Sequence, residues 1–546
     1  MAGEVEKLYA GRWVARLGGR VIAQGGTPEQ ARQAAQSRFK ELPEIIFMPG
    51  EKDLKFPEIL DLVRAAIPDV VTVYLVGGAV RDALLGCEIH DLDFVLQKDA
   101  IKIARRVARD LKADFYPLDN GRDTGRILAV DETGTQIRMD FAAYRGSDLE
   151  TDLLGRDFTI NAIAFDLRDK TIHDPLGGAQ DLQEKRLRAC SQASFSEDPV
   201  RILRGIRLAA NLGFFIQPDT RKAMRKASPL SVDISPERLR DELFRLLEGA
   251  QPATCLRALD ILGVIGHILP ELTLLKGHNQ PSPHVYDVWE HTLATLVHLE
   301  SLLSSLAIGG GSESSADLPD LLMVQRIGGF RTKIFENLAA PLTGDRSRKG
   351  LLFLAALCHD VAKPLVITND ENGQMHFWNH DQVGAQITAE RARALMMSNE
   401  ETARLRNIVS NHLRILFHVQ RLVREGKPPS RRSIYRFFRD TGSAGLEICL
   451  LGLADLRATY EQTLPPEIWA AALEVVKLML ENWFEKPCEA IDPPALVNGD
   501  DLMQVLDLKP GKRIGDLLEA IREAQAMGDV STRAQALKLA RKKLLN

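Results

Sequence analysis

The sequence predicts an α+β region in its first part and a mostly α-helical remainder. Between residues 55 and 180, short stretches with the two-residue alternation of strands are interleaved with helical stretches. Between 216 and 280, short amphipathic helices follow one another, and strongly apolar helical stretches such as 351–357 occur beyond them. A chain of 546 residues is long enough for three or four domains.

The composition is that of an ordinary globular protein, with 45% hydrophobic and 26% charged residues. No apolar run is long enough to cross a membrane, and the start, M-A-G-E-V-E-K, lacks the apolar segment of a signal peptide, so we expect a cytoplasmic protein with no membrane partner. Six cysteines are scattered without a C-x-x-C pair, which favours reduced thiols. Because the formal net charge is −4, a nucleic-acid partner would need local basic patches. The oligomeric state is left open.

The order of these patterns divides the chain into five parts. They are a small appended ββα-like module with a linker (1–50), an α+β head (51–190), a helical neck (191–280), a helical domain with a flexible insertion at about 301–350 (281–460), and a helical tail (461–546). In the first part, two short strands are followed by a helix from Pro28, and the prolines and glycine at 43–50 mark the linker.

Residues 74–96 predict a strand, a glycine turn, a short helix and a second strand. In the second strand Asp91 and Asp93 point to one face, while the apolar residues beside them point to the other. An exposed carboxylate pair can hold a hard cation such as Mg²⁺. Gly77 and Gly78 end the first strand where the helix begins, and the free amides of a helix N-terminus favour phosphate. A cation site beside a phosphate site suggests nucleotidyl transfer.

A basic helix at 100–111 comes next, followed by a probable hairpin that turns at D-E-T-G. In the second strand of this hairpin Arg138, Asp140 and Ala142 share a face. Asp140 could therefore stand beside the carboxylate pair as a third catalytic carboxylate, or it could be a solvated strand residue. The sequence leaves both readings open.

Residues 197–214 predict a helix in which Asp198 and Arg201 lie three apart on one face. An acceptor beside a forked donor can bind a base edge as a complementary strand would, whereas the plain alternative is an intrahelical ion pair. Arg201, Arg204 and Arg207 recur every third residue, with apolar residues on the buried side. One helix could thus offer a base reader and phosphate contacts.

A second group of metal-ligating residues lies in the helical part of the chain. It consists of His291, His359, Asp360, His376, His380 and Asp455. The apolar stretch 351–357 predicts a buried helix, and a His-Asp pair at its end would be costly without a partner or a metal. Imidazole and carboxylate ligands suit a transition metal such as Mn²⁺, Ni²⁺, Zn²⁺ or Fe²⁺, with Mg²⁺ also possible.

Five motifs of the first 214 residues occur in a characteristic order. They are G-G-A-V-R-D (77–82), D-L-D-F-V (91–95), R-D-F-T-I-N-A (156–162), D-P-L-G-G (174–178) and E-D-P-V-R-I-L-R-G-I-R-L-A-A-N-L-G-F (197–214). Together they resemble class II tRNA nucleotidyltransferases, or CCA-adding enzymes, and bacterial poly(A) polymerases, over about residues 55–300. The resemblance implies an α+β, polymerase β-like nucleotidyltransferase head followed by a mostly α-helical neck, HD domain and tail.

The resemblance also implies roles for the motif residues. These are metal binding by Asp91 and Asp93, triphosphate contacts by Gly77, Gly78, Arg81 and Asp82, ribose or fold-supporting roles for Arg156, Asp157 and Asn161, and template-free base selection by Asp198 and Arg201. Metal ions held by the carboxylates would activate the RNA 3′-hydroxyl and stabilise the leaving pyrophosphate, so that CMP or AMP is added to tRNA from CTP or ATP.

The sequence leaves open which nucleotides are added. Many CCA-adding members carry a longer flexible loop before R-D-F-T-I-N-A, whereas here the segment is only residues 143–155. Loss of that loop is associated in the family with CC-adding enzymes. CC addition and full CCA addition therefore both stay open, and poly(A) addition is a rival reading.

The histidine series resembles the HD superfamily of metal-dependent phosphohydrolases. The residues that match its H…HD…D signature are His291, His359, Asp360 and Asp455, with His380 and His412 as further candidate ligands or phosphate contacts. The resemblance implies a possible second activity on nucleotides or RNA ends. Two alternatives remain: an HD phosphohydrolase whose head only grips RNA, and a non-catalytic RNA-binding protein.

Two further segments are candidates for RNA binding. Residues 421–440 mix basic residues with Tyr435, Phe437 and Phe438, which suits phosphate binding with base stacking, or equally a helix core with solvated charges. Residues 508–515, L-K-P-G-K-R-I-G, place glycines and cations ahead of a helix. The last segment also resembles the tail module of HD-containing tRNA nucleotidyltransferases, which implies a tRNA-binding tail.

Overall fold

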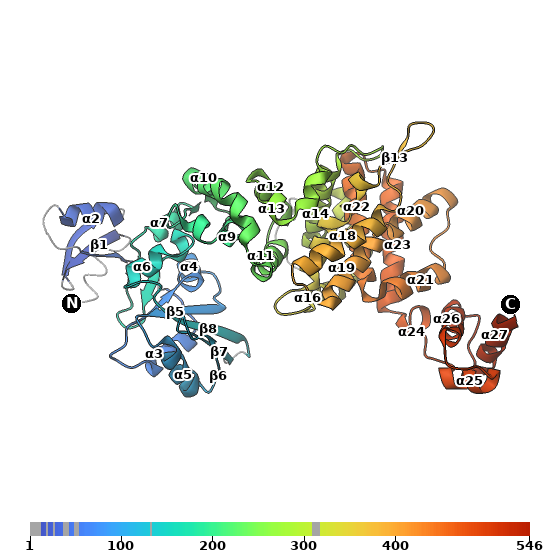
Figure 1. Cartoon of the computed structure of the whole chain (residues 1–546), viewed down its shortest axis with the longest axis horizontal. Coiled ribbons are helices and arrows are strands. Elements are labelled where there is room, and N and C mark those ends of the chain that lie inside the picture. Colours follow the sequence, from blue (N-terminus) through green and yellow to red (C-terminus); the bar gives the residue numbers. More distant parts are fainter. Residues whose placement is uncertain are drawn as a thin grey trace. The chain divides into compact units, whose positions relative to one another are not determined.

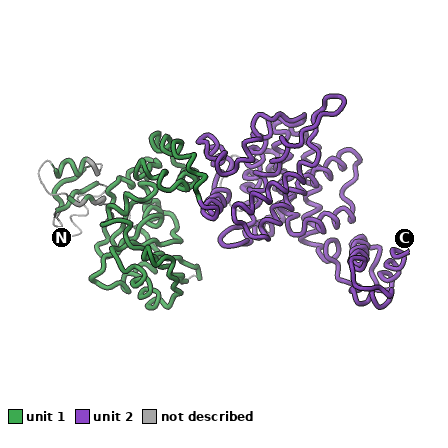
Figure 2. Tube along the Cα trace, in the orientation of Figure 1, with its two compact units in different colours: residues 1–234 green, residues 235–546 purple. Residues whose placement is uncertain are grey.

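The computed structural model describes residues 12–17, 20–25, 28–36, 43–48, 54–130, 134–307 and 317–545. Figure 1 labels the elements along the chain, and Figure 2 shows that the chain divides into two compact units. The first unit covers residues 1–234 and the second covers residues 235–546. This boundary falls inside the predicted neck, 191–280, and the five-part division stays a prediction.

The first unit is built on one mixed sheet. Its ten strands are β1 Arg12–Leu17, β2 Arg20–Gly25, β3 Glu44–Met48, β4 Val73–Val76, β5 Asp91–Leu96, β6 Asp114–Asp119, β7 Thr124–Val130, β8 Gln136–Ala143, β9 Ala164–Asp166 and β10 Ile172–His173. They lie in the order β2-β1-β3-β10-β9-β4-β5-β8-β7-β6. The pairing of β5 with β8 is parallel and all the others are antiparallel.

Short helices complete the first unit. They are α2 Pro28–Gln36, α3 Ile59–Ala66, α4 Gly78–Leu85, α5 Ala100–Leu111, α6 Leu149–Leu154, α7 Gly178–Gln183, α8 Ser194–Glu197, α9 Val200–Leu212 and α10 Pro218–Ala227, with 3-10 turns at Thr159–Asn161 and Ser228–Asp233. Two further short strands, β11 Arg186–Leu187 and β12 Phe215–Ile216, pair in parallel.

The central strands follow from the alternation in the sequence. In β5, Leu92 and Phe94 are buried while Asp91 and Asp93 are exposed, as the two-residue period of a strand predicts. Phe94 stacks on Phe141 of the neighbouring β8, with ring centroids 4.5 Å apart. The predicted hairpin is confirmed by the antiparallel pairing of β7 and β8, although residues 131–133 of its turn lie outside the described residues.

The linker predicted at 43–50 is wrong over residues 44–48, which form strand β3. This strand pairs with β1 on one side and with β10 of the head on the other. The predicted strands and helix of the N-terminal module are confirmed as β1, β2 and α2. The module is therefore an extension of the head sheet and not a separate appendage. The I-I-F run at 45–47 was the strand signal that the flanking prolines obscured.

The second unit is helical apart from one small hairpin. Its helices are α11 Pro236–Glu248, α12 Pro252–Ile261, α13 Ile265–Ile268, α14 Val288–Leu306, α15 Leu318–Ile327, α16 Arg331–Ala339, α17 Arg348–Cys358, α18 His380–Ala394, α19 Asn399–Asn411, α20 Arg414–Glu425, α21 Arg431–Thr441, α22 Gly445–Tyr460, α23 Pro466–Phe484, α24 Pro487–Ala490, α25 Gly499–Leu506, α26 Lys512–Met527 and α27 Arg533–Leu545. The hairpin is formed by β13 Thr368–Asn369 and β14 Met375–His376.

Two helices that are buried on all sides form the centre of this unit. Every residue of α17 from Gly350 to Cys358 is buried, as predicted for 351–357, and α22 is buried from Gly445 to Thr459. A helix without a polar face has to be covered on all sides. Here α14 packs against both central helices, and α19 also packs against α17. The metal-ligating candidates are carried by these same helices and their ends.

The predicted flexible insertion at 301–350 is wrong for most of its length. Residues up to Leu306 continue α14, and α15 and α16 follow from Leu318 onward. Met323 and Ile334 of these helices are fully buried. The G-G-G-S-E-S-S run itself, within 308–316, lies outside the described residues. Among the helices of the described ranges, none is long and apolar enough to cross a membrane.

Candidate functional site

The head brings three carboxylates together on adjacent strands. In the parallel pairing of β5 with β8, Asp93 lies directly opposite Asp140, and Asp91 lies opposite Arg138. Partners opposite each other in a sheet point to the same face. The prediction that Asp140 stands beside Asp91 and Asp93 is therefore confirmed as a placement.

Two of the three carboxylates have arginine partners. Arg138 donates to Asp91 at 2.5 Å, and Arg126 of β7 donates to both oxygens of Asp140 at 2.8 Å. Among the described residues, the carboxylate of Asp93 has neither a hydrogen bond nor an ion pair. The carboxylate of Asp93 is thus available to bind a ligand.

The surroundings of Asp93 also indicate a shortage of positive charge. Its side chain is accessible to solvent, but it lies in a crowded recess, and loss of surrounding water raises its pKa. The nearby Asp140 and Asp91 raise the pKa further, against an opposing effect of Arg156. A cation placed between the carboxylates would remove this repulsion. The donor set therefore fits a hard divalent cation.

Gly77 separates β4 from α4 next to this carboxylate. Its backbone has φ 75°, a conformation that side chains disfavour. A Cβ atom at Gly77 would lie 3.2 Å from Oδ2 of Asp93 and 3.5 Å from Nη1 of Arg156. The missing side chain leaves room beside Asp93, where the amides at the start of α4 can approach an anion. The geometry thus leaves space for an anion next to the carboxylates, and the phosphate contact stays a prediction.

The other motif residues form a network that connects α4 to α9. Arg81 donates to Asp82 at 2.8 Å and to Asn161 at 2.8 Å. Asn161 donates to Asp157 at 3.0 Å, and Arg204 reaches the same carboxylate at 3.1 Å. Although burial raises the pKa of Asp157, Arg204 and Asn161 hold it below its usual value. In the structure these side chains therefore position one another, and their nucleotide contacts stay predictions.

The prediction that Asp198 and Arg201 share one face of a helix is wrong. Asp198 has extended backbone angles between α8 and α9, and Pro199 precedes the first residue of α9. A residue before proline is pushed out of the helical conformation, so the D-P pair was a signal for this break. The two side chains still meet, with Nε of Arg201 3.8 Å from Asp198.

Arg201 is held by hydrogen bonds within the head, and its base-reading role stays a prediction. Only 8% of the residue is exposed. Its guanidinium donates to the carbonyl of Gly155 at 2.9 Å and to the hydroxyl of Ser194 at 2.9 Å. Arg207, on the same helix, is half-buried. Arg201 therefore fixes the start of α9 against the segment that carries Arg156.

A residue missed from the sequence holds Arg156 in place. Asp152 is almost fully buried and accepts hydrogen bonds from Nη2 of Arg156 at 3.0 Å and from the amide of Arg145 at 3.1 Å. Asp152 lies four residues before Arg156, and this i,i+4 spacing of an acid and an arginine was the available signal for an ion pair. Asp152 thus orients the arginine that faces Asp93.

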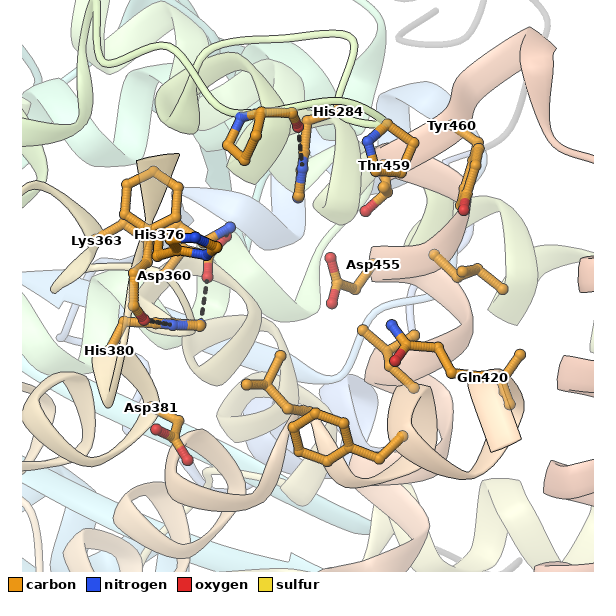
Figure 3. Close-up of a pocket in the computed structure, with 18 of the residues that line it drawn as sticks. His284, Asp360, Lys363, His376, His380, Asp381, Gln420, Asp455, Thr459 and Tyr460 are labelled. Carbon is orange, nitrogen blue, oxygen red and sulfur yellow. Dashed lines mark hydrogen bonds and ion pairs between the residues drawn. The ribbon is translucent and has the colours of Figure 1, made fainter. Parts of the chain in front are cut away.

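In the second unit, six metal-ligating side chains converge around Asp360. They are His291 from α14, His359 and Asp360 after α17, His380 at the start of α18, His412 after α19, and Asp455 from α22. Nε2 of His291 is 3.0 Å from Asp455, and Nε2 of His359 is 3.1 Å from Asp360. The other oxygen of Asp360 faces His380 at 3.4 Å and His412 at 3.9 Å. Figure 3 shows Asp360, His380 and Asp455 facing the same space.

Three of these histidines are held in the tautomer that a metal needs. Nδ1 of His359, His380 and His412 lies 2.7, 2.8 and 2.6 Å from the carbonyl oxygens of Ala356, Phe377 and Val409. An Nδ1–H that donates to a carbonyl leaves Nε2 as a lone pair. In all three residues Nε2 is buried without a hydrogen-bond partner. Since buried polar atoms rarely lack partners, these atoms fit a metal ion.

Comparison with known protein families gives four matches along the chain. They are Poly A polymerase head domain over 73–188, Probable RNA and SrmB- binding site of polymerase A over 213–275, HD domain over 288–435, and tRNA nucleotidyltransferase domain 2, putative, over 476–540. The A-adding tRNA nucleotidyltransferase of Deinococcus radiodurans is 32% identical over 85% of this chain and 93% of its own. This chain belongs to the tRNA nucleotidyltransferase family.

Two further similarities describe the family around this chain. The CC-adding tRNA nucleotidyltransferase of Thermus thermophilus is 31% identical over 84% of this chain and 91% of its own. A solved Thermotoga maritima CCA-adding enzyme, complexed with tRNA, matches 90% of this chain and 97% of its own with a TM-score of 0.53 and 22% identity. The predicted family and the predicted fold class are therefore confirmed.

Two residues near the HD site of this tRNA nucleotidyltransferase family member differ from the prediction. His376 lies on the β13–β14 hairpin, 3.2 Å from Asp370, and does not join the six-residue cluster. Lys363, which the sequence analysis missed, lies 2.6 Å from Asp360. Although burial raises the pKa of Asp360, His359 and Lys363 hold it well below its usual value. The H-D-V-A-K order was a usable signal for Lys363, because three residues after Asp360 is one turn on.

The aromatic residues at 421–440 belong to the core and do not offer stacking surfaces. Tyr435, Phe437 and Phe438 are all buried in α21. Tyr435 donates from its hydroxyl to Glu519 of α26 at 3.1 Å. Of the two readings that the sequence left open, the structure supports the helix core. The 508–515 segment begins α26 at Lys512, and its phosphate contact stays a prediction.

Proposed function

We propose that this chain is a template-independent nucleotidyltransferase that adds CMP, AMP or both to the 3′ end of tRNA. The observation that carries this proposal is the cluster of three carboxylates, from Asp91, Asp93 and Asp140, beside the glycine turn at Gly77. Family membership supports the same reaction. The substrates implied are tRNA, CTP and ATP, because similar CCA-adding enzymes have been solved with tRNA, with CTP and with ATP. The cytoplasmic location stays a prediction.

Asp91 and Asp93 are the residues that would hold Mg²⁺. When bound, Mg²⁺ supplies a Lewis acid that polarises the α-phosphate and the attacking 3′-hydroxyl. Around it, the amides at the start of α4 bind triphosphate oxygens, with Gly77 leaving the necessary space. Arg156, oriented by Asp152, adds positive charge where the pyrophosphate departs. Asp140 is engaged with Arg126, so we assign it an electrostatic role beside Asp93.

Among the possible products, the structure favours CC addition. The connection from β8 to α6 has only five residues, 144–148. Arg145 is fixed by its amide on Asp152, and Asp148 caps α6 by accepting from the amide of Thr151 at 2.9 Å. A connection this short and this well bonded has no free length for a mobile loop. The identities of the relatives, 32% to an A-adding and 31% to a CC-adding enzyme, do not decide between the two.

The deciding experiment supplies three tRNAs, lacking their last one, two or three nucleotides, with CTP, with ATP and with both. Product length is read on a sequencing gel. CC addition predicts two cytidines on the tRNA that lacks three nucleotides, one on the tRNA that lacks two and none on the tRNA that lacks one, with no further extension when ATP is added. Efficient terminal AMP addition would reject CC addition, and long adenosine tails on an unstructured RNA would point to a poly(A) polymerase. No incorporation of any nucleotide would overturn the proposed function itself.

A second candidate function is metal-dependent phosphate-ester hydrolysis in the HD domain. The observation that favours it is that the six-residue cluster opens into a cavity of about 750 Å³, a volume typical of small-molecule sites. Its lining includes the ligands Asp360, His380 and Asp455 together with Lys363 (Figure 3). Trp378, which is 67% exposed, stacks on His376 with centroids 5.1 Å apart and could receive a base.

This second function is tested with the purified protein and a panel of metals: Mn²⁺, Ni²⁺, Zn²⁺, Fe²⁺ and Mg²⁺. The substrates are 2′,3′-cyclic nucleotides and p-nitrophenyl phosphate. We expect hydrolysis that is lost in Asp360→Asn while CMP incorporation continues. Hydrolysis that survives this substitution would move the activity elsewhere. A protein that retains no metal and hydrolyses neither substrate would make the HD domain structural.

A further inference from the structure

The head carries a strongly basic groove that the proposed reaction does not use. It lies along α5 and has a volume of about 1080 Å³. We call it the α5 groove and define it by its five cations, Lys98, Lys102, Arg105, Arg106 and Arg109. All five side chains are exposed. Asp99 is the one acidic residue in the lining.

The cations of the α5 groove follow from the pattern of the helix. Positions 102, 105, 106 and 109 are spaced i, i+3, i+4 and i+7, which places them on one face. The opposite face is buried against the sheet through Ile103, Ala104, Val107 and Ala108. Like charges at i and i+4 destabilise a helix by a few tenths of a kcal/mol for each pair. A face that concentrates such pairs is not explained by the stability of the helix.

Only part of this charge is neutralised within the protein. Asp110 accepts from Arg109 at 3.0 Å and lies 4.0 Å from Arg106. Arg105 lies over the ring of Phe115 at 5.3 Å, which leaves its charge in place. Within the described ranges, Lys98 and Lys102 have no ion-pair partner. The α5 groove therefore presents a surplus of positive charge to the solvent.

Helix α5, which carries four of the five cations of the α5 groove, packs on the opposite face of the sheet from the carboxylates of Asp91 and Asp93. A Cβ atom on Gly125 of β7 would lie 3.4 Å from the side chain of Ala104, so that side of β7 faces α5. Gly125 is opposite Phe141, and Phe141 is opposite Phe94. Phe94 and Asp93 are consecutive on β5 and point to opposite faces. A ligand bound to the cations of α5 is therefore separated from Asp93 by the sheet. At its other side the groove reaches Tyr74, which lies opposite Val95 on the face of Asp93.

We propose that the α5 groove binds the phosphodiester backbone of the RNA substrate at a point away from its reacting 3′ end. The inference rests on the proposed function, because it takes RNA as the substrate. From Lys102 to Arg109 the helix rises about 10 Å, which matches about three phosphates of one strand at about 3.4 Å each. Exposed lysines and arginines at this spacing bind a polyanion of regular charge better than a single phosphate group.

Two uncharged neighbours support RNA over a small anion. Val70 is 94% exposed at the rim of the groove, and Tyr144 lines it. Burial and the carboxylates of Asp152, Asp166 and Asp148 raise the pKa of Tyr144 to about 12, so its hydroxyl stays neutral and can donate. An apolar surface and a neutral hydroxyl next to a row of cations suit ribose and phosphate together.

The test compares two triple variants of the whole chain. K102Q/R105Q/R106Q removes three charges and keeps good helix formers. The matched control, K102R/R105K/R106K, exchanges the residue types and keeps all three charges. Fluorescence anisotropy measures the dissociation constant for tRNA from 50 to 200 mM salt. In parallel, incorporation of CMP is measured on tRNA and on a short single-stranded RNA that reaches only the catalytic site.

For the charge-removing variant we expect binding to tRNA about tenfold or more weaker at low salt. The slope of log K against log salt should fall by about two to three, because each lost phosphate contact removes about one. KM for tRNA should rise while kcat stays unchanged, and incorporation into the short RNA should not change. The charge-preserving control should behave like the wild type.

Unchanged tRNA affinity and salt slope in the charge-removing variant would overturn the inference and leave an acidic protein as the occupant of the α5 groove. An equal loss of incorporation on the short RNA would also overturn it, since the groove would then act at the catalytic site. Failure of the proposed function looks different. In that case the wild type would incorporate no nucleotide on any RNA, while the comparison of binding slopes could still be made.

Discussion

The two candidate metal sites of this chain are built in opposite ways. In the head, the side chain of Asp91 is 53% exposed and is paired with Arg138, and Asp140 is paired with Arg126. In the HD domain all six ligating residues are buried, and the Nε2 atoms of His359, His380 and His412 lack partners. One site uses exposed oxygen atoms with arginines nearby, and the other uses buried nitrogen and oxygen atoms held in fixed orientations.

The difference indicates how each site would acquire its metal. Exposed carboxylates that share their charge with arginines bind a hydrated cation weakly, so Mg²⁺ would arrive with the triphosphate that completes its ligands. Buried imidazoles with fixed tautomers are already arranged for a metal and lose little entropy on binding it. We therefore expect an exchangeable metal in the head and a retained metal in the HD domain.

The largest expected effect is a loss of CMP incorporation, which depends on the head site and not on the HD site. Asp93→Ala removes the carboxylate that has no partner among the described residues, and CMP incorporation should fall by about a thousandfold or more. Metal content of the purified protein should not change, because the retained metal is in the other site. Asp169→Ala, an exposed carboxylate between β9 and β10, is the control. Substantial incorporation by Asp93→Ala would contradict the assignment of the head site.

The second effect separates the sites by metal content. Asp360→Asn removes the negative charge that four histidines face and should weaken metal binding by about a hundredfold or more. Elemental analysis after gel filtration measures the metal that remains. Nucleotide incorporation should persist in this variant when Mg²⁺ is supplied. If wild-type protein retains no metal after the same treatment, the contrast between an exchangeable and a retained site is wrong.

A third prediction concerns Arg201, the buried cation of the head. Arg201→Lys keeps the charge but cannot reach Gly155 and Ser194 together, and hydrogen bonds of charged groups contribute about 1.5–3 kcal/mol each. Tm should fall by several degrees, since 1 kcal/mol corresponds to about 2–4 °C for a unit of this size. Calorimetry measures this change. A variant with unchanged Tm but an altered choice between CTP and ATP would instead favour a direct base-reading role.

The smallest effect uses pH to separate the two units. Burial raises the pKa of Asp174 in the head to about 7. An acid whose folded pKa is raised gives stability at low pH, which is lost as the pH rises through about 7. Burial, with Arg414 and Arg421, lowers the pKa of His418 in the second unit to about 4. Its contribution is present above pH 6.5 and is lost as the pH falls toward 4.

Acidification from pH 7 to pH 5 should therefore favour the head and weaken the second unit through these two groups. Asp174→Asn and His418→Gln should each remove one of the two trends. The measurement is the difference in Tm between variant and wild type at each pH, which should change in opposite directions for the two substitutions. Differences that do not depend on pH would show that neither group titrates as described.

Local patterns predicted much of the fold. The strand with Asp91 and Asp93, the turn at Gly77 and the buried stretch 351–357 all lie where periodicity placed them. The failures occurred where distant contacts overrode a local signal. Residues 44–48 became a strand because β1 and β10 pair with them. The aromatic residues of α21 became core because Glu519 of α26, Trp483 of α23 and Gly445 of α22 lie against them. These partners are distant in the sequence, so no local pattern could indicate them.

The sequence by itself determined which residues are able to do chemistry, since motif order and the two-residue alternation placed the carboxylates on one face and identified the family. Tertiary structure alone decided which hydrogen-bond and ion-pair partners those residues have. In the folded chain Asp140 pairs with Arg126, and Arg201 donates hydrogen bonds to Gly155 and Ser194. Histidines from four separate segments lie around Asp360. The physical reason is that hydrogen bonds and burial depend on groups distant in the chain, whereas periodicity reports only on neighbours.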